Sequence, residues 1–140
     1  MEANIVVIGC GKMGSALASG LIEGEVVEAD QLYCTDRDGA KAEALAEQTG
    51  ATVVGADGAF ETLEGLERRI FIVAVKPGDV QPLVERGRRS FTESDTLVSI
   101  AAGVPTELLE EWAGDAPAVV RAMPNTPALI GRGITGVMGK

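Results

Sequence analysis

The first residues of the chain join a buried strand to a glycine turn and a helix. The β-branched run at 5–8 is typical of a strand buried on both faces of a parallel sheet. It leads directly into Gly-Cys-Gly-Lys-Met-Gly at 9–14, and apolar residues recur behind this turn at helical spacing. Strand, G-x-G-x-x-G turn and helix in this order form the dinucleotide-binding fingerprint.

Each glycine of this turn has a separate physical task. Gly9 permits the tight turn, Gly11 lets the backbone approach a pyrophosphate, and Gly14 lets helix and strand pack closely. The N–H groups at the start of the helix then face the phosphates, helped by the helix dipole. The alternative is a tight strand-to-helix turn that binds no ligand, because glycine-rich turns are common.

Further along the chain, apolar runs alternate with helical patterns. This alternation predicts one α/β domain over 1–140, a doubly wound, mostly parallel Rossmann-type sheet with helices on both faces. The expected strands lie at 5–8, 31–35, 52–54, 70–75, 97–100 and 118–122, with a last short one around Ile134.

Capping residues and glycine stops predict the ends of the helices. A helix over about 40–49 is expected to stop at Gly50. Asp79 is expected to cap the helix after 70–75, and Thr106 the helix after Pro105. The buried face of this last helix is expected to carry Leu108, Leu109 and Trp112.

Composition excludes several classes of function. The net charge of −9 argues against a nucleic-acid partner, because phosphate backbones require a basic face. No apolar segment approaches the length of a membrane span. The chain has no histidine and no paired cysteine motif, so we expect no metal site, and we expect Cys10 and Cys34 to be buried, reduced thiols. Residues 1–4 lead straight into a strand and leave no room for a signal peptide, which favours a cytoplasmic protein.

The end of the second strand predicts how the adenosine half of a cofactor is recognised. Asp36 lies 22 residues beyond Gly14, close to where a Rossmann fold places the residue that meets the ribose. A carboxylate there accepts a hydrogen bond from a 2′-hydroxyl and repels a 2′-phosphate. Arg37 has the opposite tendency, because its guanidinium can bind that phosphate; alternatively, it can stack on the adenine. We therefore expect NADH or dual use, with a second interpretation in which Asp36 or Asp38 only caps the next helix.

Four blocks of the sequence together resemble one enzyme family. They are GCGKMG at 9–14, AVKP at 74–77, SIAAGV at 99–104 and VVRAMPNTPALIGRGITG at 119–136. Their order and content resemble pyrroline-5-carboxylate reductase, and AVKP with MPNTP is more specific than the glycine turn. The resemblance spans all 140 residues and corresponds to that family's N-terminal nucleotide-binding domain.

The resemblance implies an activity and a set of binding residues. Reduced nicotinamide dinucleotide, NAD(P)H, would deliver hydride to the C=N carbon of Δ1-pyrroline-5-carboxylate and form L-proline. The implied pyrophosphate contacts are Gly9, Cys10, Gly11, Lys12, Met13 and Gly14. The implied contacts of the nicotinamide half are Ala74, Val75, Lys76, Pro77, Ala101, Ala102 and Gly103. The residues expected to border nicotinamide and substrate are Met123, Pro124, Asn125, Thr126 and Pro127.

No catalytic residue is assigned. Hydride transfer to a protonated imine requires no protein nucleophile or metal, because the cofactor supplies the reactive atom and the protein supplies orientation. The side chain of Lys76 either takes part in the site or only belongs to a turn before proline. The amide of Asn125 either orients cofactor or substrate, or the residue only shapes a turn between two prolines.

The sequence departs from the family pattern in ways that affect function. Many NADPH-using relatives have a small polar residue where this chain has Asp36, which is why we expect NADH or dual use. The family continues into a helical, dimerising domain that completes the substrate pocket, whereas this chain ends at Lys140. We therefore expect weak or no activity from residues 1–140 alone, and a homo-oligomer for the complete enzyme. Two other hypotheses are a stand-alone nucleotide-binding module and a related reductase with another substrate.

Overall fold

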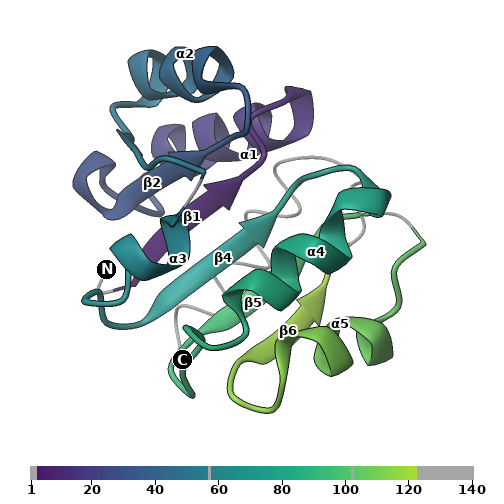
Figure 1. The fold of residues 1–140 in the computed structure, drawn as a ribbon. Coiled ribbons are helices and arrows are strands. Elements are labelled where there is room, and N and C mark those ends of the chain that lie inside the picture. Colours follow the sequence, from purple (N-terminus) through teal and green to yellow (C-terminus); the bar gives the residue numbers. More distant parts are fainter. Residues whose placement is uncertain (1–2, 57, 102, 123–140) are drawn as a thin grey trace.

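The computed structural model describes residues 3–56, 58–101 and 103–122, and within these ranges it forms a six-stranded sheet flanked by helices (Figure 1). The strands are all parallel, in the order β3-β2-β1-β4-β5-β6. They comprise β1 Asn4–Ile8, β2 Leu32–Thr35, β3 Thr52–Val53, β4 Arg69–Val73, β5 Thr96–Ser99 and β6 Ala118–Arg121. The helices are α1 Lys12–Glu23, the 3₁₀ turn η1 Ala29–Gln31, α2 Gly39–Thr49, α3 Ala59–Thr62, α4 Pro77–Gly87 and α5 Thr106–Ala113.

The strand order confirms the predicted doubly wound architecture. From β1 the chain builds outward to β2 and β3, then returns to place β4 on the other side of β1 and continues outward to β6. Ile8, the last residue of β1, is in register with Thr35 of β2 and Val73 of β4. The carboxyl ends of three strands therefore meet where the winding reverses, which is where open α/β sheets bind ligands.

The sheet is buried on both faces, as its apolar runs predict. Alternate residues of β1 point to opposite sides, so Ile5 and Val7 belong to one buried cluster and Val6 and Ile8 to the other. Helices α1 and α2 cover the first cluster. Helices α3, α4 and α5 cover the second cluster, which contains three mutually contacting rings, Phe60, Phe71 and Phe91.

A buried ion pair joins β4 to the start of β5 at the amino edge of the sheet. The Arg69 guanidinium donates to both carboxylate oxygens of Asp95, at 3.0 and 2.6 Å, and both side chains are 1% exposed. Its remaining donors reach the carbonyls of Leu63 and Ser90. Every polar atom of this arginine head is thus matched in the interior, which is the condition under which a charge can be buried.

Several predicted element ends were wrong. Strand β4 ends at Val73 rather than at 75, because Pro77 begins α4 and Lys76 is its N-cap. Asp79 consequently lies within the first turn of α4 and does not cap it.

The start and the buried face of α5 also differ from the prediction. Pro105, not Thr106, is its N-cap, and Thr106 is its first residue. On this helix Leu109 is buried as predicted, whereas Leu108 is 39% exposed and Trp112 is half-buried. Leu109 and Ala113, four residues apart, form the stripe that meets the sheet.

Two further predictions concern the end of α2 and the last strand of the chain. Gly50 ends α2 in the left-handed conformation, at φ 83°, as expected. The strand predicted around Ile134 lies outside the described residues. Within the described part of the chain, no helix is long and apolar enough to cross a membrane.

The buried ion pair generates a stability prediction. Asp95→Asn leaves the Arg69 charge buried without its counter-charge, so we expect the free energy of unfolding to fall by about 3–5 kcal/mol. Urea denaturation measures this change. Glu93→Gln, at an exposed position two residues away, is the control and should stay within about 0.5 kcal/mol of the parent. A loss below about 1 kcal/mol for Asp95→Asn would contradict the importance assigned to the pair.

Candidate functional site

The glycine turn is held by two close backbone approaches. Gly9 has φ +103°, and a Cβ atom there would lie 2.6 Å from the carbonyl oxygen of Ala74, beyond the end of β4. A Cβ atom at Gly14 would collide with the carbonyl oxygen of Gly9. Both positions therefore require glycine, for the tight turn and for the close packing of helix on strand that the sequence predicted.

Gly11 differs from the other two glycines because its surroundings are open. A Cβ atom there would meet no atom within 4 Å, and the residue is the N-cap of α1. It has no side chain to satisfy the first N–H groups of the helix, which have no intrahelical partners. The cradle at Gly11 is thus empty of protein atoms and faces the positive end of a helix dipole, as a phosphate site requires.

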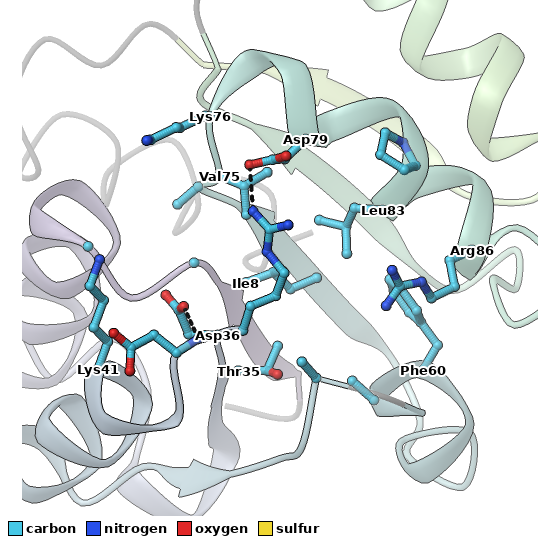
Figure 2. Close-up of a pocket in the computed structure, with 18 residues that line it drawn as sticks. Ile8, Thr35, Asp36, Lys41, Phe60, Val75, Lys76, Asp79, Leu83 and Arg86 are labelled. Atoms are coloured by element: carbon cyan, nitrogen blue, oxygen red, sulfur yellow. Dashed lines mark hydrogen bonds and ion pairs between the residues drawn. The ribbon is translucent and has the colours of Figure 1, made fainter.

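A cavity of about 500 Å³ lies beside this turn, at the carboxyl ends of β1, β2 and β4 (Figure 2). Several of the predicted cofactor contacts line it, namely Gly9, Gly11, Asp36, Arg37, Ala74, Val75 and Lys76. Other predicted contacts do not line it: Cys10, Lys12, Met13 and Gly14 belong to the turn and α1, Pro77 begins α4, and Ala101 and Gly103 follow β5. Ala102 and residues 123–127 lie outside the described residues.

Asp36 connects the glycine turn to the end of β2. One carboxylate oxygen accepts the backbone N–H of Cys10 at 2.7 Å, and the other accepts the backbone N–H of Asp38 at 2.8 Å. The helix cap is Asp38, whose side chain accepts the N–H of Ala40. Of the two interpretations of the acidic residues, capping therefore belongs to Asp38, while Asp36 lines the cavity with both oxygens held in place.

Arg37 crosses from β2 to the opposite wall. Its Nη2 lies 2.9 Å from Oδ2 of Asp79 in the first turn of α4, and Figure 2 marks this ion pair with a dashed line at Asp79. The Arg37 side chain is 79% exposed and the Asp79 side chain 37%. The pair is therefore formed at the mouth of the cavity, in contact with solvent.

A buried hydroxyl at the cavity wall has no partner. Thr35, the last residue of β2, is 3% exposed, and its Oγ1 makes no hydrogen bond within the described residues. Buried hydroxyls are nearly always hydrogen-bonded, so this oxygen is suited to a polar group of a ligand. Thr35 lines the same cavity as Asp36.

The two cysteines are free, buried thiols, as expected. Cys10 donates its S–H to the carbonyl of Thr35, and Cys34 donates to the carbonyl of Ala42, both at 3.5 Å. Interaction with the neighbouring Cys34 side chain and, second, burial raise the pKa of the Cys10 thiol above its usual range. Cys10 is therefore protonated at neutral pH and acts as an apolar packing residue, not as a nucleophile.

Sequence reasoning missed part of the wall. Asp79, Leu83 and Arg86 all line the cavity, and they are four and three residues apart on α4. Residues with this spacing share one helix face, so the pattern was available once α4 was known to begin at Pro77. Lys41 of α2 and Phe60 of α3 also line the cavity. Nothing in the local sequence distinguishes these two from ordinary surface and core residues.

Comparison with protein families identifies the family to which this chain belongs. Residues 4–103 match the family model described as NADP oxidoreductase, coenzyme F420-dependent. The chain belongs to this family. The match covers β1 through β5 and therefore includes the glycine turn and the cavity walls.

Relatives of this oxidoreductase-family chain include pyrroline-5-carboxylate reductases, which confirms the resemblance found in the sequence. The Escherichia coli K12 enzyme is 37% identical over 137 residues, covering 98% of this chain and 49% of the relative. The Pseudomonas aeruginosa enzyme is 32% identical over 133 residues, covering 95% and 47%. The chain spans about half the length of the curated relatives it matches.

Solved structures agree with this family assignment. A pyrroline-5-carboxylate reductase from Coxiella burnetii has a TM-score of 0.78 at 28% identity, covering 93% of this chain and 47% of that one. A Plasmodium falciparum pyrroline carboxylate reductase with NADP bound has a TM-score of 0.72 at 26% identity, covering 91% and 44%. Prephenate dehydrogenase from A. aeolicus has a TM-score of 0.72 at 14% identity, covering 89% and 42%, and shares the fold.

The geometry of the glycines predicts that substitution by alanine has opposite effects on stability at Gly9 and at Gly20. Gly9→Ala forces a side chain into a left-handed conformation against the Ala74 carbonyl, so the free energy of unfolding should fall by at least about 2 kcal/mol. Gly20→Ala, in open space within α1, should raise it by about 0.5–1 kcal/mol. Chemical denaturation of both variants provides the comparison, and equal stabilities would refute the strained-turn argument.

Proposed function

We propose that this chain is the cofactor-binding half of a pyrroline-5-carboxylate reductase, which reduces the C=N bond of Δ1-pyrroline-5-carboxylate to give L-proline. The observation that carries the proposal is the open cradle at Gly11, beside a cavity of about 500 Å³ at the point where the sheet winding reverses. Similarity to reductases along 98% of the chain indicates the substrate class. The reaction belongs to proline biosynthesis, and we propose a cytoplasmic location.

The residues of the cavity fit a nicotinamide dinucleotide. The backbone at 9–14 and the start of α1 would hold the pyrophosphate, with Gly11 leaving room for it. Asp36 and the unpartnered hydroxyl of Thr35 would receive the adenosine side. The nicotinamide half would lie along 74–77 and 101–103. When bound, the reduced nicotinamide supplies the hydride, and the protein orients it and excludes water.

We propose NADH as the preferred cofactor, with NADPH accepted to a lesser degree. Two backbone N–H groups hold the Asp36 carboxylate in place, so it cannot turn away from a 2′-phosphate. It remains available to accept a hydrogen bond from a 2′-hydroxyl, because a carboxylate offers about four lone-pair sites. Arg37 provides the cationic group that makes some use of NADPH feasible.

The substrate side requires more than these residues. The turn at 123–127, predicted to border nicotinamide and substrate, remains part of the proposal. By resemblance to the family, a second, helical domain completes the substrate pocket and forms a homo-oligomer. The only other partners we propose are the small-molecule substrate and the cofactor.

The first prediction of this proposal concerns cofactor binding. Gly11→Ala places a methyl group in the open cradle without touching any protein atom, so stability should fall by no more than about 1 kcal/mol, the cost of alanine at an N-cap, while affinity for NADH falls at least about tenfold. Gly20→Ala makes the same change on the same helix outside the cavity and should retain full affinity. Fluorescence titration measures both. Binding of neither nicotinamide cofactor by folded protein would overturn the proposal.

The second prediction concerns the reaction. Protein that includes the family's helical domain should convert Δ1-pyrroline-5-carboxylate and NADH to proline, whereas residues 1–140 alone should bind cofactor with little or no turnover. Proline formation and loss of reduced-nicotinamide absorbance are the measurements. Cofactor binding without reduction by the longer protein would favour a nucleotide-binding module or another substrate.

A further inference from the structure

The ion pair between Arg37 and Asp79 joins two walls of the cavity that belong to different halves of the sheet. Arg37 follows β2 and directly precedes Asp38, the cap of α2. Asp79 lies in the first turn of α4, which follows β4. The Arg37 Nη2 and Asp79 Oδ2 atoms are 2.9 Å apart, and both residues line the cavity. The cationic group next to Asp36 therefore already has an anionic partner.

We propose that Asp79 is a specificity-determining residue, which lowers affinity for NADPH relative to NADH by keeping the Arg37 guanidinium occupied. This inference rests on the proposed function, because it concerns how the same cavity chooses between two nicotinamide cofactors. It assigns a role to a residue of α4. This residue belongs neither to the glycine turn nor to the end of β2, where the residue that meets the ribose usually lies.

The physical basis of this proposal is competition between the Asp79 carboxylate and a 2′-phosphate for the same edge of the Arg37 guanidinium. Arginine binds phosphate best through two parallel N–H···O bonds, which require the planar edge of its guanidinium. Asp79 accepts from Nη2, so a 2′-phosphate that uses this nitrogen has to displace the carboxylate. NADH carries a hydroxyl at that position and has no need of the guanidinium. The ion pair therefore costs NADPH affinity and leaves NADH nearly unaffected.

The two carboxylates that flank Arg37 differ in how firmly they are held. Asp36 is anchored by the N–H groups of Cys10 and Asp38, so the position of its carboxylate in the wall is fixed. Asp79 and Arg37 are held to each other by a single contact, and Arg37 is 79% exposed. Exposed ion pairs are weak, so a 2′-phosphate can break this one. The pair therefore biases the choice of cofactor without excluding NADPH.

The decisive experiment compares cofactors and their adenosine fragments on matched variants. Asp79→Asn removes the charge at constant size, and Asp79→Ala also removes the acceptor. Glu85→Gln is the control, because it removes the same charge from an exposed position of α4 that does not line the cavity. Calorimetry on the complete protein measures Kd for NADH, NADPH, 5′-AMP and adenosine 2′,5′-bisphosphate, so the result does not depend on turnover.

We expect the Asp79 variants to bind NADPH and adenosine 2′,5′-bisphosphate about three- to tenfold more tightly, with Asp79→Ala at least equal to Asp79→Asn. Affinity for NADH and 5′-AMP should stay within about twofold, and Glu85→Gln should leave all four constants within about twofold. Thermal midpoints of the variants should match the parent to within a few degrees, because an exposed ion pair adds little stability.

The same substitution in an Arg37→Gln background distinguishes release of Arg37 from direct repulsion between Asp79 and the 2′-phosphate. In Arg37→Gln protein the guanidinium is absent, so Asp79→Asn should change NADPH affinity by no more than about twofold. Persistence of the full effect in that background would overturn the inference, as would an unchanged NADPH-to-NADH ratio in the Asp79 variants of a protein that binds both cofactors. Failure of the parent protein to bind either cofactor would overturn the proposed function, and this inference with it.

Discussion

The close approach of the glycine turn to the end of β4 is the contact on which the site depends. With Gly9 at φ +103° and no side chain, its Cα approaches the Ala74 carbonyl, and the absence of a Cβ at Gly14 lets α1 pack against the Gly9 carbonyl. These approaches bring together the ends of β1 and β4, the two strands between which the winding reverses. A crevice forms at that edge, and the start of α1 points into it. Any larger residue at either glycine would separate these elements.

Charge placement distinguishes this crevice from the rest of the molecule. The chain has a net charge of −9, yet four basic and three acidic side chains line the cavity. A small local excess of positive charge suits an anionic cofactor within a protein that otherwise repels polyanions. The acidic members are individually placed, because Asp36 is bound by backbone N–H groups, Asp38 caps α2 and Asp79 holds Arg37. The charged groups on which the proposed choice of cofactor depends therefore come from the segment after β2 and from the first turn of α4.

Most of the fold could be predicted from the sequence, because β1 and β4 contain continuous apolar runs and the turn glycines are distinctive. The errors were at element ends, such as Asp79 and Thr106, where a proline at or before the first helical position shifted the cap by one or more residues. The buried pair of Arg69 and Asp95 was not foreseen, since its members are 26 residues apart. Of the predicted cofactor contacts, Gly9, Gly11, Asp36, Arg37 and residues 74–76 line the cavity. The other described ones do not, namely Cys10, Lys12, Met13, Gly14, Pro77, Ala101 and Gly103. The wall contributed by α4 was missed.

The sequence by itself determined the architecture and the position of the glycine turn, because periodicity and glycine spacing act locally, within a few residues of the chain. It also placed a carboxylate and a guanidinium side by side at 36 and 37, without deciding between them. Only the tertiary structure showed that backbone N–H groups hold Asp36 and that Asp79, 42 residues beyond Arg37, pairs with that arginine. Such partners meet because parallel strands bring distant segments to one edge of the sheet. No local pattern specifies which side chains then come within hydrogen-bond distance.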